Sequence, residues 1–142
     1  SEAASVRVVV EPDPVAVIVN TTPTVCNGSN VNVAITSPTT PTLPGNLLFD
    51  LVVTSTNGAA LGGTASGNLS NQAFPRTING TLTNSSNAPI TVTYTVTPQL
   101  SGCSDGPVKA VNVVVEPTPQ AVLNNTTPVV CDGDNISIAV NC

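Results

Sequence analysis

Apolar and polar residues alternate with a period of two along most of the chain. The clearest example is residues 90–97, where Ile, Val, Tyr and Val alternate with four threonines. This period is the signature of a strand with one face in a core and the other toward solvent. We therefore expect Tyr94 to lie in the core with its hydroxyl bonded to the backbone. The same pattern predicts further strands over residues 15–19, 31–35, 47–53, 78–82 and 111–115.

The segments between these strands are rich in Gly, Pro, Asn and Ser. They span residues 37–46, 57–67, 84–89 and 99–107. Such residues favour turns, and no stretch shows the period of a helix. The pattern thus predicts an all-β fold of about seven strands, most simply a two-sheet antiparallel sandwich.

The chain also contains an internal repeat. Residues 6–36 and 111–141 align without a gap at an offset of 105 residues, with 18 of 31 positions identical. A repeat of this length is typical of a small sandwich domain. We therefore expect residues 1–14 to be the last strand of a preceding repeat, over residues 6–10, plus a junction. Residues 15–117 would be one complete repeat, and residues 118–142 the start of the next.

Proline residues lie at both boundaries of the complete repeat. The sequences there are EPDP and EPTP. Proline fixes φ and removes a backbone donor, so these segments are expected to be stiff. The predicted junction residues are Glu11, Pro12, Pro14, Glu116, Pro117 and Pro119.

The composition argues against several classes of function. Charged residues make up 8% of the chain and the net charge is −5. The three cations, Arg7, Arg76 and Lys109, are far apart in sequence, which argues against nucleic acid and against a charged membrane surface as partners. No apolar run approaches the ~20 residues that span a bilayer, so no membrane insertion is expected. Residues 1–5 do not resemble a signal peptide, and we expect the sequence to be part of a longer, processed chain.

The four cysteines suggest an oxidising environment. Cys26 precedes the predicted second strand and Cys103 lies in the turn before the last one, positions that can share one end of a sandwich. A disulfide between them would close a loop of about 77 residues and contribute on the order of 4 kcal/mol. Cys131 would then pair beyond this sequence or, alternatively, with Cys142. Free thiols are the remaining alternative for Cys26 and Cys103.

Catalytic signatures are missing from the sequence. There is no histidine, no nucleophile placed beside a base, no phosphate-binding loop and no cofactor motif. Asp132 and Asp134 flank a glycine in CDGDN, as calcium ligands can, but the first copy reads CNGSN, so a turn is the better interpretation. We expect no enzyme activity, no catalytic residue, no cofactor and no metal site.

Four segments together carry a family resemblance. They are TVCNGSNVNV at 24–33, GTLTNSSNAPITVTYTVTP at 80–98, SGCSDGP at 101–107 and VNVVVEP at 111–117. They resemble the PKD-like repeats of giant Bacteroidota cell-surface proteins, such as the gliding-motility adhesins exported by the type IX secretion system. The resemblance implies an immunoglobulin-like sandwich in tandem array on the extracellular cell surface. Asn141 and Cys142 depart from the first copy, which has Thr36 and Ser37 there.

These observations favour a non-catalytic stalk module of a very large adhesin. Its partners would be neighbouring repeats of the same chain, with surface polymers or glycans as candidate targets. The alternative is a subunit of a self-assembling filament or pilus that donates strands to its neighbour. A glycan- or protein-binding module is the weakest of the three hypotheses, because the sequence offers neither aromatic platforms nor clustered acids.

Overall fold

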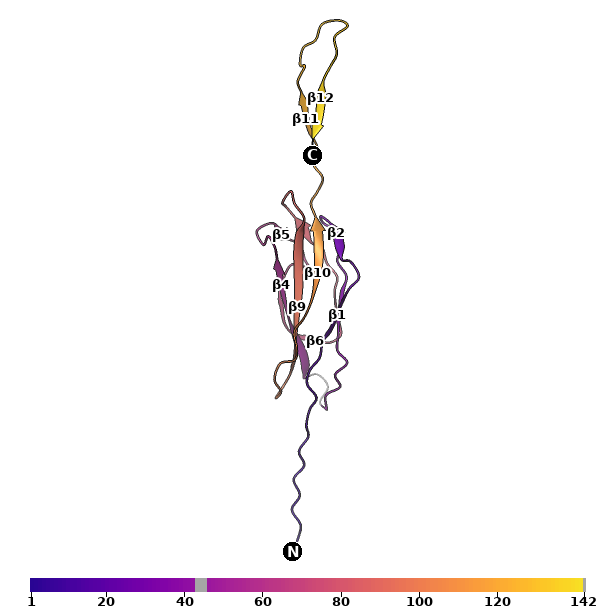
Figure 1. Ribbon diagram of the computed structural model, residues 1–142. Helices are drawn as coiled ribbons and strands as arrows, with labels where there is room; N and C mark the ends of the chain where they lie inside the picture. The colour runs from indigo at the N-terminus through magenta and orange to yellow at the C-terminus, as the bar shows by residue number, and fades with distance from the viewer. Residues whose placement is uncertain (43–45, 142) are drawn as a thin grey trace.

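The computed structural model describes residues 1–42 and 46–141, which form an all-β structure (Figure 1). Cys142 and part of the turn predicted at 37–46 lie outside these residues. The larger sheet has the order β2-β10-β9-β4-β6 and the smaller one the order β1-β3-β7. The larger sheet comprises β2 (Thr24–Cys26), β10 (Lys109–Glu116), β9 (Ile90–Leu100), β4 (Leu47–Ser55) and β6 (Leu69–Ala73). The smaller one comprises β1 (Val17–Asn20), β3 (Val33–Thr36) and β7 (Arg76–Ile78).

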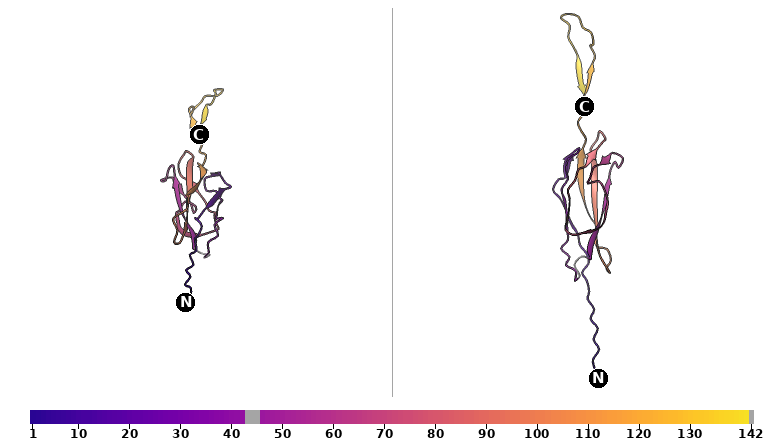
Figure 2. Two further views of the ribbon diagram at one scale, coloured as in Figure 1. Left: turned by 60° about the horizontal axis from the view of Figure 1, so that its bottom comes forward. Right: turned by 180° about the vertical axis from the view of Figure 1, so that it is seen from behind.

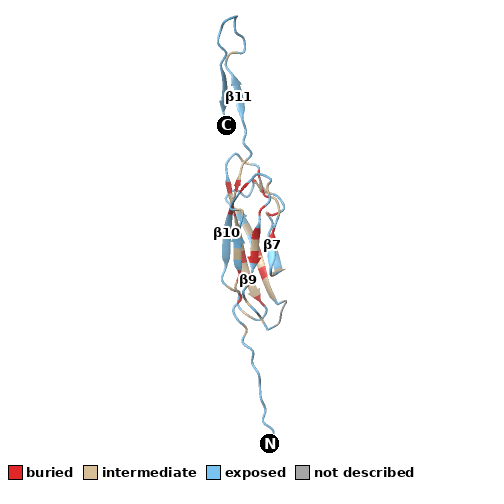
Figure 3. Cartoon of the chain, turned by 90° about the vertical axis from the view of Figure 1, so that its right-hand side faces the viewer, coloured by how far each residue is buried: buried red, intermediate tan, exposed pale blue. Residues whose placement is uncertain are grey.

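The two sheets stack as a sandwich around one apolar core. In β9 every second residue is buried, as the alternation predicted, and four threonines and Gln99 occupy the positions between. Buried residues gather inside the sandwich, whereas the segments beyond its two ends are exposed (Figure 3). The most deeply buried side chains include Val31, Val33, Ile35, Phe49, Leu51, Leu82, Val92, Tyr94, Val96, Val113 and Val115. The sequence-based prediction of an all-β sandwich is confirmed.

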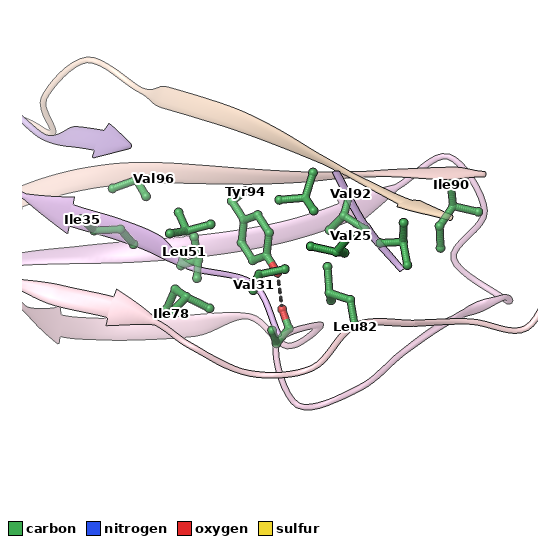
Figure 4. Packing of buried hydrophobic residues seen from close by; sticks show 14 of the residues in the cluster. Val25, Val31, Ile35, Leu51, Ile78, Leu82, Ile90, Val92, Tyr94 and Val96 are labelled. Carbon is green, nitrogen blue, oxygen red and sulfur yellow. Dashed lines mark hydrogen bonds between the residues drawn. The ribbon is translucent and has the colours of Figure 1, made fainter. Parts of the chain in front are cut away.

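Tyr94 occupies the centre of this core (Figure 4). Its side chain is fully buried, and its hydroxyl donates a hydrogen bond of 2.8 Å to the carbonyl oxygen of Ala65. Burial raises the pKa of Tyr94 to about 12, because the charged phenolate would lose its hydration. The prediction of a core tyrosine bonded to the backbone is confirmed.

The sandwich has more strands than the period of two predicted. β5 (Leu61–Gly62) and β8 (Thr83–Asn84) are two-residue strands that pair with each other. β5 lies inside the turn predicted at 57–67, and β8 ends at the first residue of the turn predicted at 84–89. β6 reads LSNQA and β2 has three residues, so neither shows a clear alternation. β2 pairs with β10 in parallel, whereas the other pairs are antiparallel.

The internal repeat is visible in the backbone pairing. β11 (Val122–Asn125) and β12 (Ile138–Asn141) form a separate hairpin whose four Cα pairs match those of β1 and β3 at an offset of 105 residues. The hydrogen bonds match as well: Thr21 N–H donates to Asn32 and Thr126 N–H to Ser137. The two copies thus share local structure as well as sequence.

Residues 6–10 were predicted to be the last strand of a preceding repeat, and this stays a prediction because the sheet of that repeat is not part of this structure. These residues form no strand, and Val6 and Val10 are 91% and 88% exposed. A strand needs a neighbour to satisfy its backbone donors and acceptors. Within the described residues this segment has none.

Candidate functional site: the two junctions of the sandwich

The chain enters and leaves the sandwich at opposite ends (Figures 1 and 2). We call the end that residue 15 enters the entry end; it also carries residues 37–42 and the β9–β10 loop, residues 101–108. The exit end is where β10 finishes at Glu116; it also carries residues 26–30 and 84–89. The register of β9 and β10 places Ile90 beside Val115 at the exit end and Val96 beside Lys109 toward the entry end.

At the entry end, Glu11 binds the loop that follows β3. Its carboxylate accepts the backbone N–H of Thr42, with distances of 2.9 and 3.3 Å to its two oxygens. Hydrogen bonding from Thr42, through its side chain and its backbone N–H, lowers the pKa of the Glu11 carboxyl. The predicted junction residue Glu11 therefore contacts the body of the sandwich 31 residues further along the chain.

Two hydroxyl side chains hold the next part of this junction. Thr39 Oγ1 accepts the backbone N–H of Val15 at 2.9 Å and lies 3.4 Å from the carbonyl oxygen of Asp13, to which it donates. Ser37 Oγ donates to the carbonyl oxygen of Val15 at 2.6 Å. These bonds fix the backbone just before β1, where the chain enters the smaller sheet.

Gly106 completes the entry end from the β9–β10 loop. Its N–H donates to the carbonyl oxygen of Pro98 at 2.9 Å. A Cβ atom at this position would lie 1.7 Å from the carbonyl oxygen of Pro14, well inside van der Waals contact. Only glycine allows the loop to approach Pro14 so closely. Sequence reasoning missed Gly106, because nothing local distinguishes it from the other turn glycines.

The contact between Glu11 and Thr42 should depend on pH. Because the pKa of Glu11 is lowered in the folded chain, the contact is complete above the ordinary pKa of a glutamate and is lost as the pH falls through the lowered value. We expect the amide resonance of Thr42 to shift with that titration in an NMR series. In Glu11→Gln the acid-dependent shift should disappear, whereas Glu2→Gln should leave it unchanged. An unchanged Thr42 titration in Glu11→Gln would contradict the contact.

At the exit end, Asn27 links the sandwich to the second junction. Its amide nitrogen donates to Thr118 Oγ1 at 2.7 Å, and its side-chain oxygen accepts the backbone N–H of Asn84 at 2.8 Å. A shallow hollow beside this contact is lined by Cys26, Asn27, Glu116, Pro117, Thr118 and Pro119. The predicted residues Glu116, Pro117 and Pro119 therefore line the same hollow as Cys26 and Asn27 of the sandwich.

Asn84 is the one buried polar residue of the described chain. Its amide nitrogen donates to the carbonyl oxygens of Ala88 at 2.8 Å and of Val115 at 3.0 Å. Its side-chain oxygen accepts both the N–H and the hydroxyl of Ser86, at 2.9 and 2.7 Å. It therefore joins the loop before β9 to the end of β10, just before the junction.

The predicted disulfide between Cys26 and Cys103 is wrong for this structure, in which both are free thiols. Cys26 pairs in register with Glu116 at the exit end, whereas Cys103 follows Leu100 at the entry end, where its N–H bonds the carbonyl of that residue. β9 alone, with eleven residues, separates the two ends by about 35 Å. A disulfide requires Cα atoms within about 7 Å of each other. Cys131 is also a free thiol, and its alternative partner Cys142 lies outside the described residues.

Neither a metal cluster nor a membrane span occurs in the described part of the chain. Over residues 1–42 and 46–141, no three His, Cys, Asp or Glu side chains gather as metal ligands. Asp134 instead accepts the backbone N–H of Cys131 at 3.1 Å and closes a turn, as the sequence predicted. No helix of the described residues has the length and hydrophobicity to cross a bilayer. In comparisons with known proteins, no family model, no curated protein and no solved structure matches this chain.

Proposed function

We propose that residues 15–117 are a non-catalytic stalk repeat of a large extracellular cell-surface adhesin. The observation that carries this proposal is the pair of junctions. The chain enters and leaves the sandwich at opposite ends, and the sandwich bonds the junction at each end. Units linked in this way extend along one direction.

The repeat relates the two junctions to each other. Glu11 and Glu116 are equivalent at the offset of 105 residues, as are Pro14 and Pro119. Each junction would therefore be held on one side by the exit end of one repeat, through the contact that Asn27 makes. On the other side it would be held by the entry end of the next repeat, through the contacts that Thr42 and Gly106 make. Bonds on both sides favour a stiff linkage.

The family and location in this proposal come from the sequence resemblance to PKD-like surface repeats. Two sheets of three and five strands are compatible with such a sandwich. The low content of charged residues suits a chain displayed outside the cell. The candidate targets of adhesion are surface polymers or glycans.

The stalk proposal predicts that length grows with repeat number. Chains would be purified in which residues 15–119 occur once, twice or four times in succession, preceded by residues 1–14 and followed by residues 120–142. These chains would be imaged by negative-stain electron microscopy over a range of concentrations. We expect particle length to rise by at least about 35 Å per added copy, the length of β9, at every concentration. Compact particles whose length ignores copy number would contradict it.

A filament subunit is the alternative, and one observation favours it. The β11–β12 hairpin exposes apolar side chains whose equivalents in β1 and β3 face the core, such as Ile138, which is 55% exposed where Val33 is fully buried. Such a hairpin could complete the sheet of another molecule. Long fibres growing from the single-copy chain as its concentration rises would support this alternative and overturn the stalk.

A further inference from the structure

The two cysteines of the sandwich lie next to its two junctions. Cys26 is exposed and lines one hollow with Pro117, Thr118 and Pro119 at the exit end. Cys103 is half-buried in the β9–β10 loop at the entry end. Three residues further along this loop, Gly106 packs against the carbonyl oxygen of Pro14. Each thiol is therefore within about 10 Å of backbone from a residue that contacts its junction.

The repeat offset brings these two positions to the same junction. Pro119 is the equivalent of Pro14 at the offset of 105 residues. A following repeat would therefore place its own glycine, the counterpart of Gly106, against Pro119, and its counterpart of Cys103 beside the same junction. Cys26 approaches that junction from the preceding repeat. One thiol from each repeat would flank every junction.

We propose that Cys26 of one repeat forms a disulfide with the Cys103 counterpart of the next. This inference rests on the proposed tandem stalk. It gives each repeat two bridges, one at each end, and uses both cysteines, which are too far apart to pair with each other. Such a bridge would lock consecutive repeats in one orientation, in addition to the hydrogen bonds that Glu11 and Asn27 make.

The chemistry is thiol oxidation by a disulfide oxidant. The thiolate of one cysteine attacks the oxidant and forms a mixed disulfide, which releases one thiol. The second cysteine, as its thiolate, then attacks the mixed disulfide. The two protein thiols lose two protons and two electrons in total, and the oxidant is reduced to two thiols. Oxidised glutathione supplies this oxidant in the test.

The test uses the full chain with residues 15–119 present twice in succession, and with Cys131→Ser and Cys142→Ser to remove competing thiols. After oxidation, the remaining thiols are alkylated and the chain is cut by trypsin without reduction. Cleavage after the only three cations, Arg7, Arg76 and Lys109, separates Cys26 from Cys103. The first-copy Cys26 then lies in the peptide 8–76, which differs in mass from its second-copy counterpart.

We expect mass spectrometry of the monomeric fraction to show peptide 8–76 linked to peptide 77–109. Two matched variants identify the partner, because the two copies of peptide 77–109 are identical. Cys103→Ser in the second copy should abolish this link, and Cys103→Ser in the first copy should leave it intact. The opposite result would mean that the two cysteines pair within one repeat and would overturn the proposal.

Electron microscopy of the same oxidised chain separates this inference from the stalk itself. Absence of the linked peptide in particles of the expected double length would overturn the bridge and leave the stalk standing. Concentration-dependent fibres would instead overturn the stalk. A link found only in covalent dimers of the chain would also count against a bridge between consecutive repeats.

Discussion

Tyr94→Ala should lower the free energy of unfolding by about 4 kcal/mol, the cost expected for removing a large aromatic side chain from a close-packed core. Tyr94 is fully buried between the two sheets, and Phe49 and Leu51 of the neighbouring β4 are buried with it. Its removal leaves a cavity and also leaves the carbonyl oxygen of Ala65 without its donor. Urea denaturation followed by circular dichroism would measure the loss as a lower midpoint.

Tyr94→Phe separates the two contributions. It keeps the ring and removes only the hydroxyl that bonds Ala65 at 2.8 Å. We expect a loss of about 1 kcal/mol, the net value of one hydrogen bond. Equal losses in the two variants would show that the hydroxyl, and not the ring packing, dominates the contribution of this residue.

Asn84→Ala should destabilise the sandwich by about 3 kcal/mol. The side-chain amide of Asn84 makes four hydrogen bonds, each worth about 1 kcal/mol net. Its removal also leaves the partner groups in this region without a hydrogen bond. The loss should be concentrated at the exit end, because Asn84 bonds Val115 near the end of β10. Hydrogen exchange of the amides in residues 84–90 and 113–116 would then rise more than that of the β1–β3 pair.

Ser55→Ala is the matched control for this variant. Ser55 Oγ is buried and has no hydrogen-bond partner among the described residues, so Ser55→Ala breaks no hydrogen bond and should not lower the free energy of unfolding. A loss in Asn84→Ala no larger than in Ser55→Ala would show that the amide network does not stabilise the exit end.

The fold was predictable where one strand face is buried. β9 and β10 contain the alternating segments 90–97 and 111–115 and extend a few residues beyond them. Their register is well specified, because a slip of one residue would turn their apolar side chains to solvent. β5 and β8 were missed, since two residues cannot show a period. β2 was missed because its stability comes from pairing with β10, which is 90 residues away. Such pairing leaves no trace in the local sequence.

The candidate site was predictable only in part. Proline and glutamate marked both junctions, but the residues that hold them were invisible: Thr39, Thr42 and Gly106 contact a segment about 25 to 95 residues away. The disulfide prediction failed for the same reason. Which end of the sandwich receives Cys103 depends on the direction of β9 and β10, and the period of two does not encode direction.

The parallel pairing of β2 with β10 has a mechanical consequence. In the proposed array, a pulling force would act on the sandwich through residue 15 at one end and Glu116 at the other. β2 would be drawn toward the entry end and β10 toward the exit end, so the three register pairs between them would be loaded in shear. Bonds in shear share the load and break together, whereas bonds pulled open from one end break in turn. The short strand β2 would therefore act as the clamp that sets the force at which a repeat unravels.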